Sequence, residues 1–349
     1  MRRLILLAAI FCILSGARGA ASEQPAKFPA AEWERHDPAE NGWSSAKLAE
    51  AEAWSRGLGT TAVIVVHRGV IVAEWGDVVA KTPLASVRKS LLSALYGNAV
   101  ARGEIRLTQA IGELGIDDNE PSLSADEKTA TVRDLLQARS GIFHPALYET
   151  PAMAARRPAR FSQKPGTFWY YNNWDFNTLG AIYEHAARSS VFDAFDREIA
   201  RPIGMQDYRP SDGRYITGAA SVYPAYPIDM SARDLARFGL LYLQKGRWSD
   251  RQVIPERWVA ESVQAYSEPE PGLGYGYMWW TGFSDRAKTA VELPPGSFSA
   301  RGHGGQLAFV IPAYELVVVH RAPFTGRGQS VLELGRLLRL IFEAGQLVR

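Results

Sequence analysis

Two hairpin patterns near opposite ends of the chain constrain its fold more than any other feature. Residues 61–67 (TAVIVVH) and 70–75 (VIVAEW) are β-rich runs joined around Arg68-Gly69, and residues 307–311 and 316–320 form a second such pair. Helical patterns dominate between them. A hairpin at each end predicts an antiparallel sheet assembled from both chain ends. We therefore expect an α+β fold, with helices flanking this sheet and an inserted, mostly helical lobe.

The first twenty residues differ from the rest of the chain. Arg2 and Arg3 precede an apolar run over residues 4–14, and small residues follow it. This pattern is typical of a secretory signal peptide and is too short for a stable membrane anchor. We expect residues 1–20 to be cleaved, with no stable membrane span left afterwards, and the protein to be exported, either periplasmic or secreted. An uncleaved N-terminal anchor is the alternative.

The remaining chain is expected to form a leader and one domain. Residues 21–43 predict an extended leader, and residues 44–349 predict a single domain. Within it we expect an α/β lobe from residues 44–96 and 205–349, and a helical lobe from residues 97–204. Helices are predicted over residues 44–58, 86–96, 178–188, 192–200, 231–243 and 329–344, with capping boxes at Thr131 and Ser231.

Charge and cysteine content exclude several classes of function. The 349 residues carry 39 basic and 37 acidic side chains, a formal net charge of +2, which gives no electrostatic basis for binding nucleic acid. The one cysteine, Cys12, lies in the predicted signal, so the mature chain lacks a thiol nucleophile, a disulfide and thiolate metal ligands. The six histidines do not have metal-site spacing. We expect no metal and no other cofactor.

Residues 86–96 (SVRKSLLSALY) predict a helix that is too apolar for a surface position. Ser86 and Lys89 share one face of it, so a hydroxyl nucleophile and an amine lie within reach of each other at a donor-rich helix N-terminus. Ser44 and Lys47 repeat this spacing at the start of a polar helix, where Ser44 is expected to be the N-cap. By itself, the spacing explains Ser86 as a cap or as a nucleophile equally well.

Two later segments supply partners for Ser86. Tyr171 and Asn173, in the loop PGTFWYYNN, offer a phenol for acid–base chemistry and an amide that can hold a carbonyl or orient a lysine. The segment ARGHGGQ at residues 300–306 places glycines before a strand, where an N–H can face a developing oxyanion. The alternatives are aromatic loop packing for the first segment and a turn with a solvated His303 for the second.

In this order and spacing, the three segments resemble the motifs of serine hydrolases of class C β-lactamase type. That family includes class C β-lactamases, D-alanyl-D-alanine carboxypeptidases, family VIII esterases and 6-aminohexanoate-dimer hydrolases. Its motifs Ser-x-x-Lys, Tyr-x-Asn and Lys-Thr-Gly are matched here by Ser86 with Lys89, by Tyr171 with Asn173, and by the variant His303-Gly304-Gly305. The likeness runs from about residue 44 to the C-terminus and implies a β-lactamase/transpeptidase-like fold.

The resemblance also implies roles for these residues. Ser86 attacks a carbonyl and becomes acylated, while Lys89 and Tyr171 carry its proton to the leaving group. This requires either a neutral Lys89 or an anionic Tyr171. Backbone N–H groups of Ser86 and Gln306 form the oxyanion hole. The implied substrate-binding residues are Asn173, His303, Gly304 and Gly305.

The third motif departs from the family pattern, because the Lys and Thr that hold the carboxylate of a β-lactam or peptide are absent. This favours small esters or amides without that carboxylate, as in the esterase and 6-aminohexanoate-dimer hydrolase branches. The alternatives are a β-lactamase or D-alanyl-D-alanine carboxypeptidase, and a non-catalytic protein that binds a cell-wall fragment or a β-lactam. The oligomeric state is left open. Five aromatic residues either line an apolar acyl pocket or, for several of them, belong to the core: Trp169, Tyr170, Trp174, Trp279 and Trp280.

Overall fold

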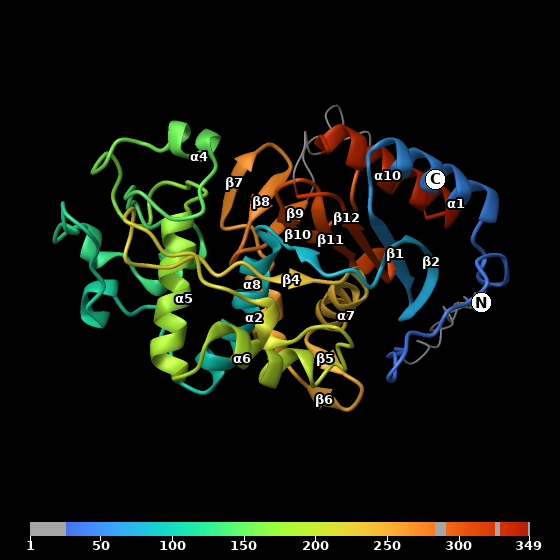
Figure 1. The fold of residues 1–349 in the computed structure, drawn as a ribbon, viewed down its shortest axis with the longest axis horizontal. Helices are drawn as coiled ribbons and strands as arrows, with labels where there is room; N and C mark the ends of the chain where they lie inside the picture. Colours follow the sequence, from blue (N-terminus) through green and yellow to red (C-terminus); the bar gives the residue numbers. More distant parts are fainter. Residues whose placement is uncertain (1–25, 283–290, 325–328, 348–349) are drawn as a thin grey trace, which may run out of the picture.

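The computed structural model describes residues 26–282, 291–324 and 329–347, so the predicted signal segment lies outside the described residues. Its main feature is an eight-stranded antiparallel sheet that includes both predicted hairpins (Figure 1). In spatial order its strands are β2 (Val70–Gly76), β1 (Ala62–His67), β12 (Leu316–Arg321), β11 (Gln306–Ile311), β10 (Phe298–Gly302), β9 (Trp280–Gly282), β8 (Leu273–Tyr275) and β7 (Ser267–Glu270).

The helices and the short strands complete the fold. The helices are α1 (Ser45–Gly57), α2 (Val87–Ala101), α3 (Val132–Leu136), α4 (Pro151–Arg156), α5 (Asn173–Ala187), α6 (Val191–Phe195), α7 (Ala232–Leu243), α8 (Glu256–Ser262) and α10 (Val331–Ala344). The short strands are β3 (Thr82–Pro83) paired with β4 (Asp229–Met230), and β5 (Arg247–Trp248) paired with β6 (Arg251–Gln252). No helix in the described ranges is long and apolar enough to cross a membrane.

Both faces of the sheet are buried, which explains its continuous apolar runs. Successive side chains of a strand point to opposite faces. Val63 and Val65 of β1 therefore join a core with α1 and α10, while Ile64 and Val66 join a second core with α2 and α7. Fully burying each such side chain contributes about 1.5–3 kcal/mol. Figure 1 shows α1 and α10 side by side on one face, so the two chain ends close the same layer.

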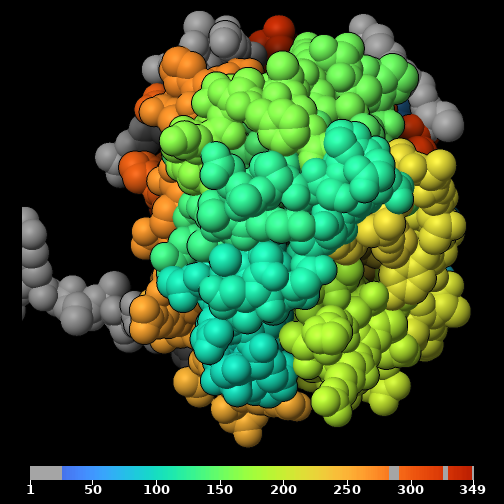
Figure 2. Space-filling model, turned by 90° about the vertical axis from the view of Figure 1, so that its left-hand side faces the viewer, coloured from blue at the N-terminus to red at the C-terminus, as the bar shows by residue number. Residues whose placement is uncertain are grey.

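The helical part lies at the far end of the molecule from the two termini (Figure 1). The chain between α2 and α7 forms α3 to α6 and gives no strand to the main sheet. Figure 2 looks at this end and shows it covered by the teal and green chain that follows α2, with yellow chain along one edge. The segment between α2 and α7 is therefore mostly helical and is inserted between the strands contributed by the two chain ends.

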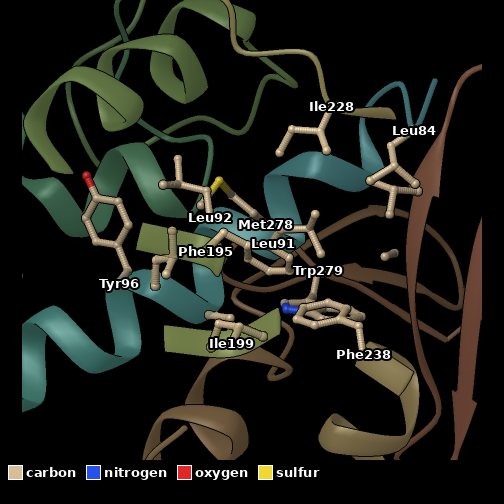
Figure 3. Close-up of a cluster of buried hydrophobic side chains, with 14 of the residues drawn as sticks. Leu84, Leu91, Leu92, Tyr96, Phe195, Ile199, Ile228, Phe238, Met278 and Trp279 are labelled. Carbon is tan, nitrogen blue, oxygen red and sulfur yellow. The ribbon is translucent and has the colours of Figure 1, made fainter. Parts of the chain in front are cut away.

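Helix α2 lies in the middle of the protein, as its apolar sequence predicts. Twelve of its fifteen residues are buried. Figure 3 shows Leu91 and Leu92 surrounded by side chains from several parts of the chain, among them Phe195, Phe238 and Trp279. The N-terminus of α2 is consequently fixed by contacts around almost the whole helix.

The predicted helix starts are partly right. Ser44 caps α1, since its hydroxyl accepts a hydrogen bond from the Lys47 N–H at 3.3 Å, and Thr131 forms a complete capping box with α3. Ser231 forms only half of its predicted box. Its hydroxyl caps α7, but the Asp234 carboxylate accepts hydrogen bonds from the backbone N–H groups of residues 206–208 instead. This carboxylate therefore fastens the loop between the helical part and α7.

The described part of the predicted leader is extended and packed onto the domain. Residues 26–43 contain one short 3₁₀ turn, and both Trp33 and Trp43 are buried. The buried guanidinium of Arg237 donates to the carbonyls of Ala30 and Ala31, each at 2.9 Å, and to that of Ile203 at 2.9 Å. These contacts fasten the segment to α7.

Candidate active site

The chain that leads into α2 is held tightly before Ser86. The buried Arg321 of β12 donates to the carbonyls of Thr82, Pro83 and Met230 at 2.8, 3.1 and 2.7 Å. Ala85 then adopts a left-handed conformation, with φ of 49°. This conformation is costly for a residue with a Cβ and is characteristic of functional sites. It ends the β3 segment abruptly and places Ser86 directly before the first residue of α2.

Ser86 stands at the N-cap position of α2 but does not act as a cap. Its backbone is already α-helical, and its side chain accepts no hydrogen bond from the first turn. The hydroxyl instead lies 2.9 Å from the amine Nζ of Lys89. Ser44, with the same spacing to Lys47, does cap its helix. The structure therefore separates the two Ser-x-x-Lys segments that the spacing alone could not.

Tyr171 and Asn173 reach Lys89 because of the way α5 begins. Asn172 is the N-cap, and its side chain accepts a hydrogen bond from the Trp174 N–H at 3.1 Å. Tyr171 therefore precedes the helix and Asn173 is its first residue, five positions before the predicted start at residue 178. Lys89 Nζ lies 2.8 Å from the Tyr171 hydroxyl and 2.8 Å from Asn173 Oδ1.

The orientation of the Asn173 side-chain amide is fixed by the hydrogen bond that its Nδ2 atom makes on the side away from Lys89. Asn173 Nδ2 donates to the backbone carbonyl of Tyr148 at 2.7 Å. A carbonyl oxygen only accepts, so the other end of the amide, Oδ1, must face Lys89. Asn173 Oδ1 therefore accepts one hydrogen bond from the Lys89 amine. This bond orients the amine so that its other hydrogen bonds are directed toward Ser86 and Tyr171.

Burial controls the protonation of this group. Lys89 is fully enclosed, and desolvation, helped by the neighbouring charge of Arg88, holds its pKa well below the usual value of a lysine. Desolvation raises the pKa of Tyr171 to about 12, against smaller lowering effects of Ser86 and Arg88. Of the two states that the sequence left open, the environment favours a neutral amine beside a neutral phenol. A neutral Lys89 has a lone pair that can accept the Ser86 proton.

The five predicted aromatic residues divide between core and site. Trp174 and Trp279 are fully buried in the core, and Tyr170 donates to the backbone carbonyl of Met153. Trp169 and Trp280 remain partly accessible around Tyr171. The ring of Trp280 stacks on that of Tyr171, with centroids 5.5 Å apart and an interplanar angle of 22°. These two tryptophans form an apolar wall next to the reacting groups.

The Gly-rich segment forms the turn between β10 and β11. Gly302, at the end of β10, lies so close to the chain before Ser86 that an added Cβ would be 2.4 Å from the Leu84 carbonyl oxygen. Glycine is needed here for this close approach. His303 is exposed, the position of Gly304 faces Pro323 and Phe324, and that of Gly305 faces Gln329 and His320. The binding roles predicted for these three residues stay predictions.

Gln306 pairs with Gly302 in the hairpin, and its side chain is buried. The side-chain amide donates to the Ala322 carbonyl at 2.7 Å and accepts from Arg321 Nε at 2.8 Å. These bonds fix the hairpin to the same arginine that holds the chain before Ser86. The Ser86 N–H makes no backbone hydrogen bond in the part of the chain that the structure describes. Its predicted oxyanion role, and that of the Gln306 N–H, stay predictions.

The structure adds contacts that the sequence did not indicate. Tyr148 and Met278 have left-handed backbones, with φ of 63° and 60°. Ser90 of α2 donates to the Met278 carbonyl at 2.8 Å. Arg88 is buried beside Lys89. No local pattern marks these positions, because each owes its place to a neighbour far away in the sequence. Within the described ranges, no group of three His, Cys, Asp or Glu residues is arranged to hold a metal ion.

This fold and this arrangement of Ser86, Lys89 and Tyr171 define the class of protein. The model of the Beta-lactamase family matches residues 30–322, which is most of the chain. The chain therefore belongs to the β-lactamase family, whose members share a hydrolase fold of this kind.

Solved structures confirm the α+β fold at low sequence identity. A protein from Bacillus anthracis, provisionally named a 6-aminohexanoate-dimer hydrolase, gives a TM-score of 0.65 at 20% identity over 92% of this chain and 88% of that chain. A class C β-lactamase in complex with cefoxitin gives 0.62 at 16% identity over 86% and 99%. EstCE1, a hydrolase with promiscuous acyltransferase activity, gives 0.60 at 16% identity over 86% and 98%.

Proposed function

We propose that the protein is a serine hydrolase that cleaves small esters or amides through an acyl-enzyme on Ser86. The observation that carries this proposal is the position of the buried Lys89 amine. Its Nζ lies 2.9 Å from Ser86 Oγ and 2.8 Å from the Tyr171 hydroxyl. A base must be within hydrogen-bond reach of the proton that it removes and must be unprotonated at the working pH. Lys89 is within reach of Ser86, and desolvation lowers its pKa, which favours the unprotonated form.

The first half of the reaction forms the acyl-enzyme. Neutral Lys89 takes the proton of Ser86 while Oγ bonds to the substrate carbonyl carbon, whose oxygen becomes an oxyanion. The Ser86 N–H, which makes no backbone hydrogen bond in the described ranges, is one donor for this oxyanion. The β10–β11 hairpin is the source of the second, with Gln306 as the expected position. The proton then passes from Lys89, with Tyr171 as relay, to the leaving alcohol or amine as its bond to carbon breaks.

The second half regenerates the enzyme. Water gives a proton to Lys89, its oxygen bonds to the acyl carbon, and Ser86 Oγ leaves and recovers a proton from Lys89. The product is a carboxylic acid. No other reactant is needed for this balance.

The substrate preference rests on what surrounds Ser86. Trp169 and Trp280 provide an apolar wall, which suits an apolar acyl or alcohol group. The exposed His303 and the neighbouring Gly304 stand in place of the Lys and Thr expected for a carboxylate-bearing β-lactam or peptide. The similarity to EstCE1 and to the provisionally named 6-aminohexanoate-dimer hydrolase supports the same choice.

The test compares the mature protein with Ser86→Ala and with Ser90→Ala. Ser90 is a matched control, since it is buried on the same helix and bonds Met278 instead of Lys89. Nitrophenyl esters of several chain lengths and a chromogenic cephalosporin are the substrates, and intact mass follows the acyl adduct. We expect ester turnover that Ser86→Ala abolishes and Ser90→Ala retains.

Each other outcome contradicts a part of the proposal. Turnover that survives Ser86→Ala removes the nucleophile assignment. Faster cleavage of the cephalosporin than of any ester indicates a β-lactamase, and D-alanine release from a D-alanyl-D-alanine peptide indicates a carboxypeptidase. A stable adduct without turnover indicates a sensor.

We also propose that residues 1–20 direct export, so that the enzyme acts in the periplasm or outside the cell. The Arg2-Arg3 start and the apolar run after it support this proposal. N-terminal sequencing of protein recovered from the periplasm and from the medium tests it. Intact residues 1–20 on cell-associated protein would indicate an uncleaved anchor.

A further inference from the structure

Arg88, between Ser86 and Lys89 in sequence, is a buried cation with no acidic partner among the described residues. Its side chain is on the first turn of α2 and is 1% exposed. Its Nη1 donates to the Ala85 carbonyl at 2.9 Å. Nε and Nη2 are buried and have no hydrogen-bond partner in the described part of the chain. A buried charge is normally paired, so this arrangement requires an explanation.

Two aromatic rings hold the guanidinium. Its carbon Cζ lies 5.1 Å from the ring centroid of Tyr148 and 5.1 Å from that of Tyr226. Aromatic faces attract a cation without neutralising it, and the attraction is strongest where water is excluded. The rings therefore keep the charge of Arg88 in place and leave its field acting on its neighbours.

Arg88 contacts the two strained peptides that border the reacting groups. Its hydrogen bond goes to Ala85, the left-handed residue directly before Ser86. Its ring contact goes to Tyr148, also left-handed, whose carbonyl accepts the hydrogen bond of Asn173 Nδ2. Asn173 in turn orients Lys89. A single side chain thus supports the nucleophile from one side and the base from the other.

We infer that Arg88 is a positioning residue for acyl transfer, fixing the peptides of Ala85 and Tyr148 and keeping an unneutralised positive charge next to Lys89. This inference rests on the proposed hydrolase function. A positive charge there disfavours the ammonium form of Lys89. In agreement, Arg88 contributes to the lowered pKa of Lys89 and opposes the rise in that of Tyr171.

Other ionisable groups near Lys89 and Tyr171 include two phenols, both of which interact with Tyr171. Tyr226 comes from the segment before β4 and Tyr275 from β8, and burial raises the pKa of both. The carboxyl of Asp175 acts on Tyr275, and burial raises its pKa well above the usual value, whereas the charge that acts on Lys89 is that of Arg88. Arg88 is therefore the charged side chain that biases the protonation of Lys89.

The test measures the rate at which a fluorophosphonate phosphonylates Ser86, with loss of fluoride, as a function of pH. Labelling is followed by intact mass, and it depends on the nucleophile and base but not on the natural substrate. The acid limb of this profile is the pH range in which the labelling rate falls as Lys89 becomes protonated. We expect Arg88→Met to move this acid limb to higher pH by about one unit, which is a roughly tenfold loss of labelling rate near neutrality. The loss should shrink as the pH rises and Lys89 becomes neutral in both proteins.

Arg88→Lys and Arg88→Gln separate charge from position and serve if Arg88→Met does not fold. Arg88→Lys should keep the acid limb near that of the wild type, because the positive charge is retained. Its labelling rate at high pH should be lower, because an ammonium cannot both stack between two rings and bond Ala85 as a planar guanidinium does. Arg88→Gln should move the limb. Arg237→Met is the matched control, a buried arginine that binds backbone carbonyls away from the site, and should lower thermal stability without moving the limb.

Two results overturn the inference. One is an equal loss at every pH with an unchanged limb in both Arg88→Gln and Arg88→Met, which is the behaviour of a purely structural residue. The other is an unchanged rate and profile in all three Arg88 variants. Failure of the proposed hydrolase function looks different, since wild-type Ser86 would then be labelled without ester turnover, and the dependence of labelling on Arg88 would still be measured.

Discussion

At the scale of single residues, the side-chain amide of Asn173 orients Lys89 and affects its protonation. Its amide bridges the Tyr148 carbonyl and the Lys89 amine, with distances of 2.7 and 2.8 Å. A neutral amide at this point accepts a hydrogen bond from the Lys89 amine and does not strongly favour its ammonium form. A carboxylate in the same place would favour the ammonium form, in which Lys89 has no lone pair for the Ser86 proton.

Asn173→Asp is accordingly expected to raise the pKa of Lys89. The acid limb of kcat/KM for ester hydrolysis should move to higher pH, with at least about a tenfold loss near neutrality, since each unit of pKa is a tenfold change in the neutral fraction. A pH–rate profile checks this.

Asn177→Asp is the control for that substitution. Asn177 lies one helical turn further along α5, is buried, and donates to the Leu147 carbonyl at 3.1 Å. It should lower stability and leave the limb in place. An Asn173→Asp profile identical to that of the wild type would contradict the role given to the amide.

The elements around the site are held by close backbone approach. Gly302 lets β10 touch the chain before α2, and Gly239 lets α7 lie against β12. A Cβ added at Gly239 would be 2.6 Å from Val317 Cγ1. Gly239 also has helical neighbours on both sides, so helix propensity favours a larger residue there. Packing and propensity therefore predict opposite effects at this position, and their magnitudes decide between them.

Gly239→Ala is expected to destabilise the protein by about 1–3 kcal/mol, because overpacking in a full core outweighs the roughly 1 kcal/mol gain in helix propensity. Urea unfolding measures the change. Gly57→Ala at the end of α1 is the control, since an added Cβ meets nothing within 4 Å there. It should be neutral or slightly stabilising. A stabilised Gly239→Ala would show that the α7–β12 contact is looser than described.

At the scale of the whole molecule, both chain ends are joined in one sheet, and His320 marks the junction. Its Nε2 lies 2.8 Å from the Thr60 hydroxyl at the start of β1, and its Nδ1 donates to the Gly305 carbonyl at 2.7 Å. Nε2 therefore accepts from Thr60 in the neutral ring. Burial lowers the pKa of His320 to about 4, so the folded protein holds this ring neutral.

An unfolded chain has an ordinary histidine pKa of about 6.5, so it binds more protons than the folded protein between pH 6.5 and 4. The contribution of His320 to stability is present above pH 6.5 and should be lost as pH falls to 4, by about 3 kcal/mol. Denaturant unfolding between pH 4 and 7 measures this. His320→Gln should flatten the decline, while substitution of the exposed His185 should not. An equally steep decline without His320 would place the acid sensitivity elsewhere.

The sequence by itself determined the features that depend on close neighbours. The apolar runs of β1, β2, β11 and β12 predict strands at both chain ends, and Ser44 and Thr131 predict their helix caps. The order and spacing of the motifs around Ser86, Tyr171 and His303 indicate the family. Strands β7–β9 were not predicted, because runs of three or four residues show no clear period, and β7 contains Pro269 and two glutamates.

Only the tertiary structure decided whether Ser86 is a cap or a partner of an amine. It also brought Gly302 against Leu84, and it enclosed Lys89 and Arg88 without an acid between them. These properties depend on residues up to about two hundred positions apart, and burial and close packing belong to the assembled layers and not to any local pattern. The order of the candidate site residues can be read from the sequence, whereas the distances between them and their burial depend on packing.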